Sequence, residues 1–228
     1  MDGLGVKGAF MFEYVEDKEY LSRVRSVCGE IMQDFCHTLK EDYDIGSTFY
    51  LVGSGAKNLI VQNASQPIDL DYNLEIVRCE YFGDCRKLKE CARKAFNKAL
   101  SMNGWGDCED STSSLTTERR HFTQGNQTLF SIDVCIVFTD TQDRMCRLIH
   151  VKTGFIYDDR YYWNQAPHSS GVREKVDFIK RKGKWNLVRE QYLWLKNKYL
   201  TSNDYNHPSF ICYIEAVSNV YNSRMSWK

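Results

Sequence analysis

The feature that most constrains this chain is a clean two-residue alternation over residues 68–77. The apolar members of the alternation would all point to one face of an extended strand: Ile68, Leu70, Tyr72, Leu74 and Ile76. The polar members include two aspartates, Asp69 and Asp71, which would both point to the opposite face. A period of two predicts a strand with one buried face and one polar face.

A third aspartate occupies a similar position in a later apolar segment. Asp133 lies in the middle of residues 128–138, where it interrupts a run of strand-forming residues. A buried carboxylate without a partner is costly unless a cation or an open cleft accompanies it. Three carboxylates that converge from neighbouring strands are most often held together by divalent cations with oxygen ligands. Asp69, Asp71 and Asp133 therefore predict a site for Mg²⁺ or Mn²⁺, and two such ions form the clamp used in phosphoryl and nucleotidyl transfer.

A glycine-rich turn supplies a second element of the predicted chemistry. The apolar run at 48–52 is followed at once by Gly53, Ser54 and Gly55, and residues 55–62 favour the start of a short helix. Backbone N–H groups in such a turn bind phosphate oxygens, and the helix dipole adds to the attraction. Lys57 lies close by in the sequence and would neutralise phosphate charge.

Taken together, the segments LVGSGAKNL, PIDLDYNLEI and LFSIDVCIVF resemble the polymerase-beta-like nucleotidyltransferase superfamily. The resemblance implies that Asp69 and Asp71 bind both metal ions and that Asp133 binds the catalytic one. It further implies that Gly53 and Ser54 hold the triphosphate of a nucleoside triphosphate.

The resemblance covers residues 48–138 well and the later part of the chain more loosely. Fourteen residues separate Ser54 from Asp69, a somewhat long gap that suggests an inserted turn at 63–67. The order of the motifs and their expected strand positions carry the argument, because a lone Asp-x-Asp or Gly-Ser-Gly is usually a solvated face or an ordinary turn.

The remaining periodicity predicts an α/β fold with a small, mixed, twisted sheet of the nucleotidyltransferase type. Amphipathic patterns predict helices at 17–41, 84–102, 170–182, 185–200 and 208–222, and strand patterns predict a hairpin at 111–138 and a strand at 146–151. We expect the first two helices on one face of the sheet and an acidic cleft on the other. Residues 1–151 would form the catalytic domain, and residues 152–228 a helical C-terminal subdomain that closes over the cleft.

The hairpin suggests two further site residues. If Gly125 and Asn126 form a two-residue loop, Asp133 faces Glu118, and Ser131 faces Arg120. Glu118 would then be a general base for the acceptor hydroxyl or an additional metal ligand, and Arg120 would meet phosphate. The competing interpretation is a surface salt bridge between Glu118 and Arg120, and a slip of one residue would instead present the neighbouring arginine at 119.

Charge is divided unevenly along the chain. The net charge is zero, which disfavours non-specific nucleic-acid binding, but residues 1–150 carry a net −6 and residues 151–228 a net +6. On the helix at 170–182, Arg173 and Lys180 lie beside the apolar stripe, where long side chains reach an edge. We expect these two residues to bind the phosphates of a nucleotide, against the alternative of a solvated basic face. Four aromatic residues would stack a base or pack in the core: Tyr157, Tyr161, Tyr162 and Trp163.

The predicted function is transfer of a nucleoside monophosphate from a nucleoside triphosphate to an acceptor hydroxyl or phosphate, with release of pyrophosphate. We expect a small molecule or a second nucleotide as the acceptor in preference to a nucleic acid, because the basic tail, residues 152–228, is too short for an elaborate RNA-binding apparatus. The alternative is a nucleotide- or RNA-binding module that kept the fold and lost turnover. A metal-dependent phosphodiesterase would need histidine ligands, and none lies near the triad in sequence.

Cysteine usage and hydropathy bear on the location of the protein. The nine cysteines form no Cys-x-x-Cys pair and favour free thiols in a reducing compartment. There is no apolar run of 18 residues and no signal-peptide pattern. We expect a cytoplasmic protein that does not bind a membrane, and the pattern leaves its oligomeric state open.

Overall fold

The computed structural model describes residues 11–166, 171–202 and 208–227. Contacts group the chain into two compact units, which are described separately. The sheet unit comprises the described parts of residues 17–57 and 67–168, and the helical unit comprises those of 1–16, 58–66 and 169–228.

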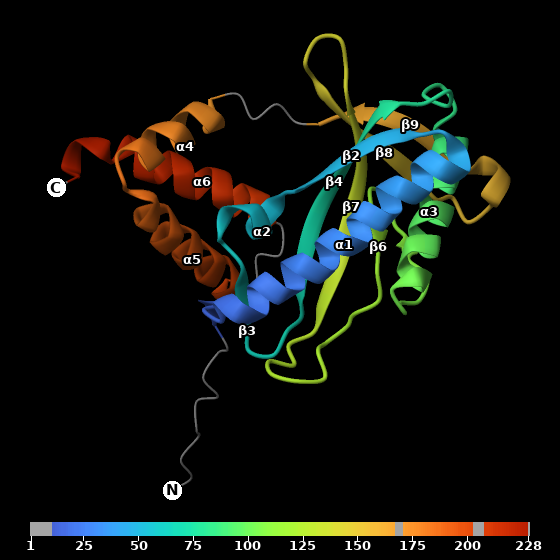
Figure 1. The fold of residues 1–228 in the computed structure, drawn as a ribbon. Coiled ribbons are helices and arrows are strands. Elements are labelled where there is room, and N and C mark those ends of the chain that lie inside the picture. Colours follow the sequence, from blue (N-terminus) through green and yellow to red (C-terminus); the bar gives the residue numbers. More distant parts are fainter. Residues whose placement is uncertain (1–10, 167–170, 203–207, 228) are drawn as a thin grey trace, which may run out of the picture. The chain divides into compact units, whose positions relative to one another are not determined.

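A seven-stranded mixed sheet organises the sheet unit (Figure 1). Its strands are β2 (Gly46–Leu51), β4 (Ile68–Arg78), β5 (Glu109–Asp110), β6 (Leu115–Thr116), β7 (Phe130–Thr139), β8 (Met145–Val151) and β9 (Arg160–Gln165). The order is β2-β4-β7-β6-β5, and β8 joins the later half of β7 and pairs in turn with β9. Only β4 and β7 run parallel, so these two central strands present their residues in the same direction.

Two long helices cover one face of this sheet (Figure 1). The side chain of Asp17 accepts a hydrogen bond from a backbone N–H in the first turn of α1 (Lys18–Tyr43), and Asp84 does the same for α3 (Cys85–Met102). The two helices pack together through the stacked rings of Phe35 and Phe96, whose centroids are 4.7 Å apart. A five-residue helix, α2 (Gly53–Lys57), follows β2 directly.

Alternation in the central strands separates a dry face from a polar face. In β4 and β7 the fully buried residues include Leu70, Leu74, Ile132, Val134 and Ile136. Burial of these aliphatic side chains stabilises the unit by about 1.5–3 kcal/mol each. Among the intervening residues on the opposite face, Asp69, Asp71 and Asp133 keep exposed surface and are available for polar chemistry.

The helical unit contains three helices and a small two-stranded sheet. The helices are α4 (Val172–Arg181), α5 (Trp185–Thr201) and α6 (Ser209–Asn222), followed by the 3₁₀ turn η2 (Arg224–Ser226). Strand β1 (Phe12–Tyr14) pairs with β3 (Val61–Asn63), and Leu59 packs with the helices. The core includes Ile179 of α4, Val188 of α5 and Val217 of α6, each fully buried.

The structure confirms the predicted fold class and the five longer predicted helices to within a few residues. The short helix expected within residues 55–62 lies instead at Gly53–Lys57, and Val61–Asn63 form β3. Residues 160–165, which we expected in the helical subdomain, form β9 and extend the sheet through pairing with β8. The proposed division at residues 1–151 and 152–228 stays a prediction, while the contacts place residues 11–16 and 58–66 with the C-terminal helices.

None of the helices in the described part of the chain is both long and apolar enough to cross a membrane. None of the nine cysteines forms a disulfide.

Candidate active site

Parallel pairing of β4 and β7 brings the predicted aspartates together on one face. Asp71 lies directly beside Asp133 in the register, and Asp69 lies beside Ser131. Because side chains alternate along both strands, all three carboxylates emerge on the polar face of the sheet. Asp69 is exposed, whereas Asp71 and Asp133 are half-buried. The structure thus joins residues that are more than 60 positions apart in sequence.

Two hydroxyl groups hold the outer carboxylates in place. The Ser131 hydroxyl donates to Oδ1 of Asp69 at 2.5 Å, and the Thr116 hydroxyl donates to Oδ1 of Asp133 at 2.5 Å. Thr116 is positioned by β6, where it pairs with Asp133 across the antiparallel ladder. Bonds from hydroxyl donors to ionised acceptors are short and strong, so these two contacts fix the side-chain orientations.

Crowding of negative charge changes the acidity of this cluster. Burial, together with the charges of Asp133 and Asp69, raises the pKa of Asp71 to about 6, while Lys57 and Arg147 act in the opposite direction. Burial also raises the pKa of Asp133, an effect opposed by its hydrogen bond from Thr116. The polar face therefore carries carboxylates whose charged forms are disfavoured until a cation joins them.

The glycine turn lies against the central aspartate. Gly53 has a φ of +60°, and a Cβ atom built on it would lie 2.2 Å from Oδ2 of Asp71. Only glycine fits this close approach and this left-handed conformation. The Val52 N–H donates to the backbone oxygen of Asp71 at 2.8 Å, which ties the turn to β4. Ser54 follows in α2, and Lys57 Nζ donates to the Gly53 carbonyl at 3.0 Å.

The donor set is chemically suited to a hard divalent cation, because it consists of three carboxylates on adjacent strands. Within residues 11–166, 171–202 and 208–227, however, no three acidic, histidine or cysteine side chains converge closely enough to hold an ion. Asp69 and Asp133 are instead turned toward Ser131 and Thr116, as repulsion between like charges favours. Binding of Mg²⁺ among Asp69, Asp71 and Asp133 would require these two carboxylates to rotate, and the metal site stays a prediction.

The expected pairing of Glu118 with Asp133 was wrong. Thr116 takes that position, because Arg120 pairs with Phe130, one residue away from the predicted register, and the offset grows to two residues at Thr116. The carboxylate of Glu118 accepts from the Gly106 N–H at 2.8 Å and forms an ion pair with Nε of Arg120 at 2.8 Å. This salt bridge matches the competing interpretation, so the geometry offers no support for Glu118 as a base or for Arg120 as a phosphate ligand.

Sequence reasoning missed a cation on the polar face. Arg147 pairs with Val137 across β7 and β8, and Val137 shares its face with Asp133. The Nε atom of Arg147 is buried and has no hydrogen-bond partner among the described residues. Its charge also favours the ionised form of Asp71. No sequence signal could have found Arg147, because its position depends on the register of a strand pair.

The remaining predicted site residues are Arg173 and Lys180, which lie in the helical unit, and four aromatic residues, which lie in the sheet unit. Arg173 and Lys180 are exposed on α4, and Nζ of Lys180 lies 4.9 Å from the centre of the Trp185 ring. Their role toward a nucleotide stays a prediction. Among the four aromatic residues considered for base stacking, Trp163 packs on Phe138 with centroids 4.6 Å apart.

The fold of this chain is similar to that of several solved structures. The cyclic AMP-GMP synthase DncV of Vibrio cholerae, in complex with a linear intermediate, matches with a TM-score of 0.60 and 12% identity over 92% of this chain and 69% of DncV. The cyclic dinucleotide synthase CdnE of Elizabethkingia meningoseptica, bound to GTP and Apcpp, matches with a TM-score of 0.50 and 16% identity, over 87% and 70% of the two chains. CdnC of E. coli MS115-1 with ATP matches with a TM-score of 0.52 and 15% identity, over 89% and 61%.

No protein-family profile matches the sequence. No curated protein matches it either. The likeness to solved structures lies below 20% identity and therefore shows the fold alone. The chain has the fold of the polymerase-beta-like nucleotidyltransferases, as the three sequence segments led us to expect.

Proposed function

We propose that this protein transfers a nucleoside monophosphate from a nucleoside triphosphate to an acceptor hydroxyl, with release of pyrophosphate. The observation that carries the proposal is the pairing of Asp71 with Asp133 across two parallel strands, with the Gly53 turn against Asp71. A structural role for three adjacent carboxylates is hard to justify, since their charged forms oppose one another.

In this proposal the aspartates and the glycine turn would have separate roles. Asp69, Asp71 and Asp133 would hold the divalent cation, which would supply charge neutralisation at the reacting phosphate. Backbone N–H groups at Gly53 and Ser54 would bind the triphosphate, with Lys57 adding positive charge. Asp133 would orient the acceptor hydroxyl. The hydroxyl oxygen forms a bond to the α-phosphorus, the bond to the β-phosphate oxygen breaks, and the hydroxyl proton leaves to a base.

A second nucleotide is the acceptor that we propose. The solved structures with this fold include a cyclic dinucleotide synthase with GTP and Apcpp, and a cyclic AMP-GMP synthase in complex with the linear intermediate 5′ pppA(3′,5′)pG. The half-buried Arg147, with its buried Nε, would place positive charge on the side of the sheet where an anionic acceptor approaches.

The test is release of labelled pyrophosphate from each of four nucleoside triphosphates, singly and in pairs, with and without Mg²⁺. We expect metal-dependent release and, for at least one nucleotide or pair, a linked dinucleotide identified by mass spectrometry. Thermal stabilisation by nucleotide without any release of pyrophosphate would instead support a binding module that has lost turnover.

A further inference from the structure

A cavity of about 430 Å³ is lined by residues that belong neither to the triad Asp69, Asp71 and Asp133 nor to the glycine turn. It is bordered by α3, the segment leading into β5, strand β8, and the turn between β8 and β9. Its volume falls within the range of small-molecule sites, roughly 300–1,000 Å³. All of its lining residues belong to the sheet unit.

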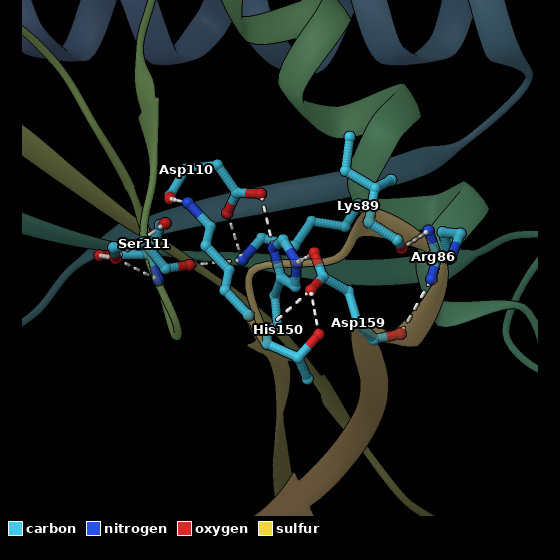
Figure 2. A network of polar contacts seen from close by, with 10 residues as sticks. Arg86, Lys89, Asp110, Ser111, His150 and Asp159 are labelled. Atoms are coloured by element: carbon cyan, nitrogen blue, oxygen red, sulfur yellow. Dashed lines mark hydrogen bonds and ion pairs between the residues drawn. The ribbon is translucent and has the colours of Figure 1, made fainter.

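A buried network of charges forms one wall of this cavity (Figure 2). The two ring nitrogens of His150 lie 2.8 Å from Asp110 and 2.9 Å from Asp159. Lys89 lies 2.6 Å from Asp110, and the second oxygen of Asp159 accepts from the Thr153 N–H. Each oxygen of the two aspartates therefore already lies against a cationic side chain, the His150 ring or a backbone N–H group of the protein.

The cations of the wall still have donors to spare. The ammonium of Lys89, which is only 2% exposed, has three N–H bonds, and two of them reach Asp110 and the Ser111 carbonyl. In the described part of the chain, no acceptor is present for the third. Lys152 contacts the Asp110 carbonyl alone, and the half-buried Arg93 has no hydrogen-bonded or ionic partner among the described residues.

The lining holds three cations and three carboxylates, so the attraction for an anion depends on the spare N–H donors and not on net charge. Lys89, Arg93 and Lys152 line the same cavity and have N–H donors to spare, whereas the two aspartates already contact groups of the protein. Glu90, on the exposed rim, is the remaining carboxylate among the lining residues. Convergent donors on a partly enclosed surface bind carboxylate or phosphate groups more strongly than the same donors do in open water.

We propose that this cavity binds a small anion that carries carboxylate or phosphate groups, with Lys89, Arg93 and Lys152 as its ligands. The site is independent of the proposed nucleotidyl transfer, since none of its residues belongs to the triad or to the glycine turn. The buried network would keep Lys89 fixed in place, so that an anion meets a preorganised ammonium.

The experiment compares citrate and inorganic phosphate as separate probes of the full chain without divalent metal, at constant ionic strength set by NaCl. Thermal melting and calorimetry measure binding. We expect at least one probe to stabilise the protein beyond the NaCl reference, and Arg93→Gln to weaken its binding by about tenfold. The probe that binds identifies the preferred anionic group.

Matched variants separate a site from general charge screening. Lys94→Gln removes an exposed cation from the same helix outside the cavity, and we expect it to bind the probe as the wild type does. Glu90→Gln should tighten binding, and Asp133→Asn should leave it unchanged. The proposal is overturned if neither probe binds beyond the NaCl reference, or if Arg93→Gln and Lys94→Gln weaken binding equally.

Discussion

The side chain of Asp71 is partly buried, lies near the like charges of Asp69 and Asp133, and is closely approached by the Gly53 backbone. Its carboxylate is half-buried beside Asp133, and the Gly53 backbone leaves no room for a side chain between turn and strand. In this position the ionised form of the carboxylate is destabilised when no cation is present, and a bound cation would stabilise it. An ionised Asp71 therefore lowers the stability of the metal-free protein, whereas metal binding would require the ionised form.

We predict that Asp71→Asn stabilises the metal-free protein at neutral pH. The folded-state pKa of about 6 lies above the ordinary 3.8, so the folded state binds the proton more tightly than the unfolded state does. This contribution to stability is fully present below pH 3.8 and is lost as the pH rises through 6. With EDTA at pH 8, the variant should melt about 2–4 °C higher, the scale of 1 kcal/mol for a chain of this size. At pH 4 the difference should nearly vanish.

A second prediction concerns the fit of Gly53 against Asp71. Gly53→Ala should destabilise the fold by about 1–3 kcal/mol and weaken nucleotide binding, because its φ is positive and the new methyl group would meet the carboxylate. Gly29→Ala is the matched control, since nothing lies within 4 Å of its Cβ position in α1, and it should gain about 0.5–1 kcal/mol. Denaturant unfolding measures both, and equal effects of the two substitutions would refute the close-approach argument.

At the scale of elements, strand β6 contributes one hydroxyl group, that of Thr116, to the candidate active site. Thr116 lies beside Asp133 and donates to it, which opposes the effect of burial on that carboxyl. Thr116→Val keeps the shape of the side chain and removes the donor. We predict about a tenfold loss of turnover with an upward shift of its acidic pH limit, because the pKa of Asp133 rises further. Thr116→Ser should restore most of the rate, and a Ser variant as poor as the Val variant would point to packing instead.

Local patterns predicted these elements better than they predicted how the elements pair. The alternation over residues 68–77 indicated β4 and its polar face, because burial on one side of a strand is written directly in the sequence. The register of Asp133 was missed, because the pairing is offset from the predicted one by one residue at Arg120 and by two at Thr116, and no short motif encodes such an offset. Thr116 and Arg147 reach the site through strand pairing, which depends on contacts between distant segments.

For the whole molecule, the opposite charges of the two parts of the sequence remain the clearest property. Residues 1–150 are acidic and residues 151–228 are basic. The sequence could not predict that residues 58–66 belong with the C-terminal helices, because only tertiary contacts of Leu59 and β3 determine this. Metal and nucleotide carry opposite charges, so a chain divided in this way is suited to bind both.

The basic tail yields a prediction at this scale. Charge-neutral substitutions Arg173→Gln and Lys180→Gln should each weaken nucleoside triphosphate binding by about threefold to tenfold at low salt, and the loss should shrink at high salt because the attraction is screened. Affinity measured at two salt concentrations tests this. If neither substitution changes the affinity, the tail has a solvated basic face and does not bind phosphate.

The most direct test of the account is pyrophosphate release by Asp133→Asn, measured beside nucleotide binding and thermal stability. The variant should fold, bind a nucleoside triphosphate and lose turnover by about 100-fold or more, because an amide cannot replace the carboxylate at the paired strands. Mg²⁺-dependent release at the wild-type rate from the folded variant would contradict the assignment of Asp69, Asp71 and Asp133 as the catalytic centre.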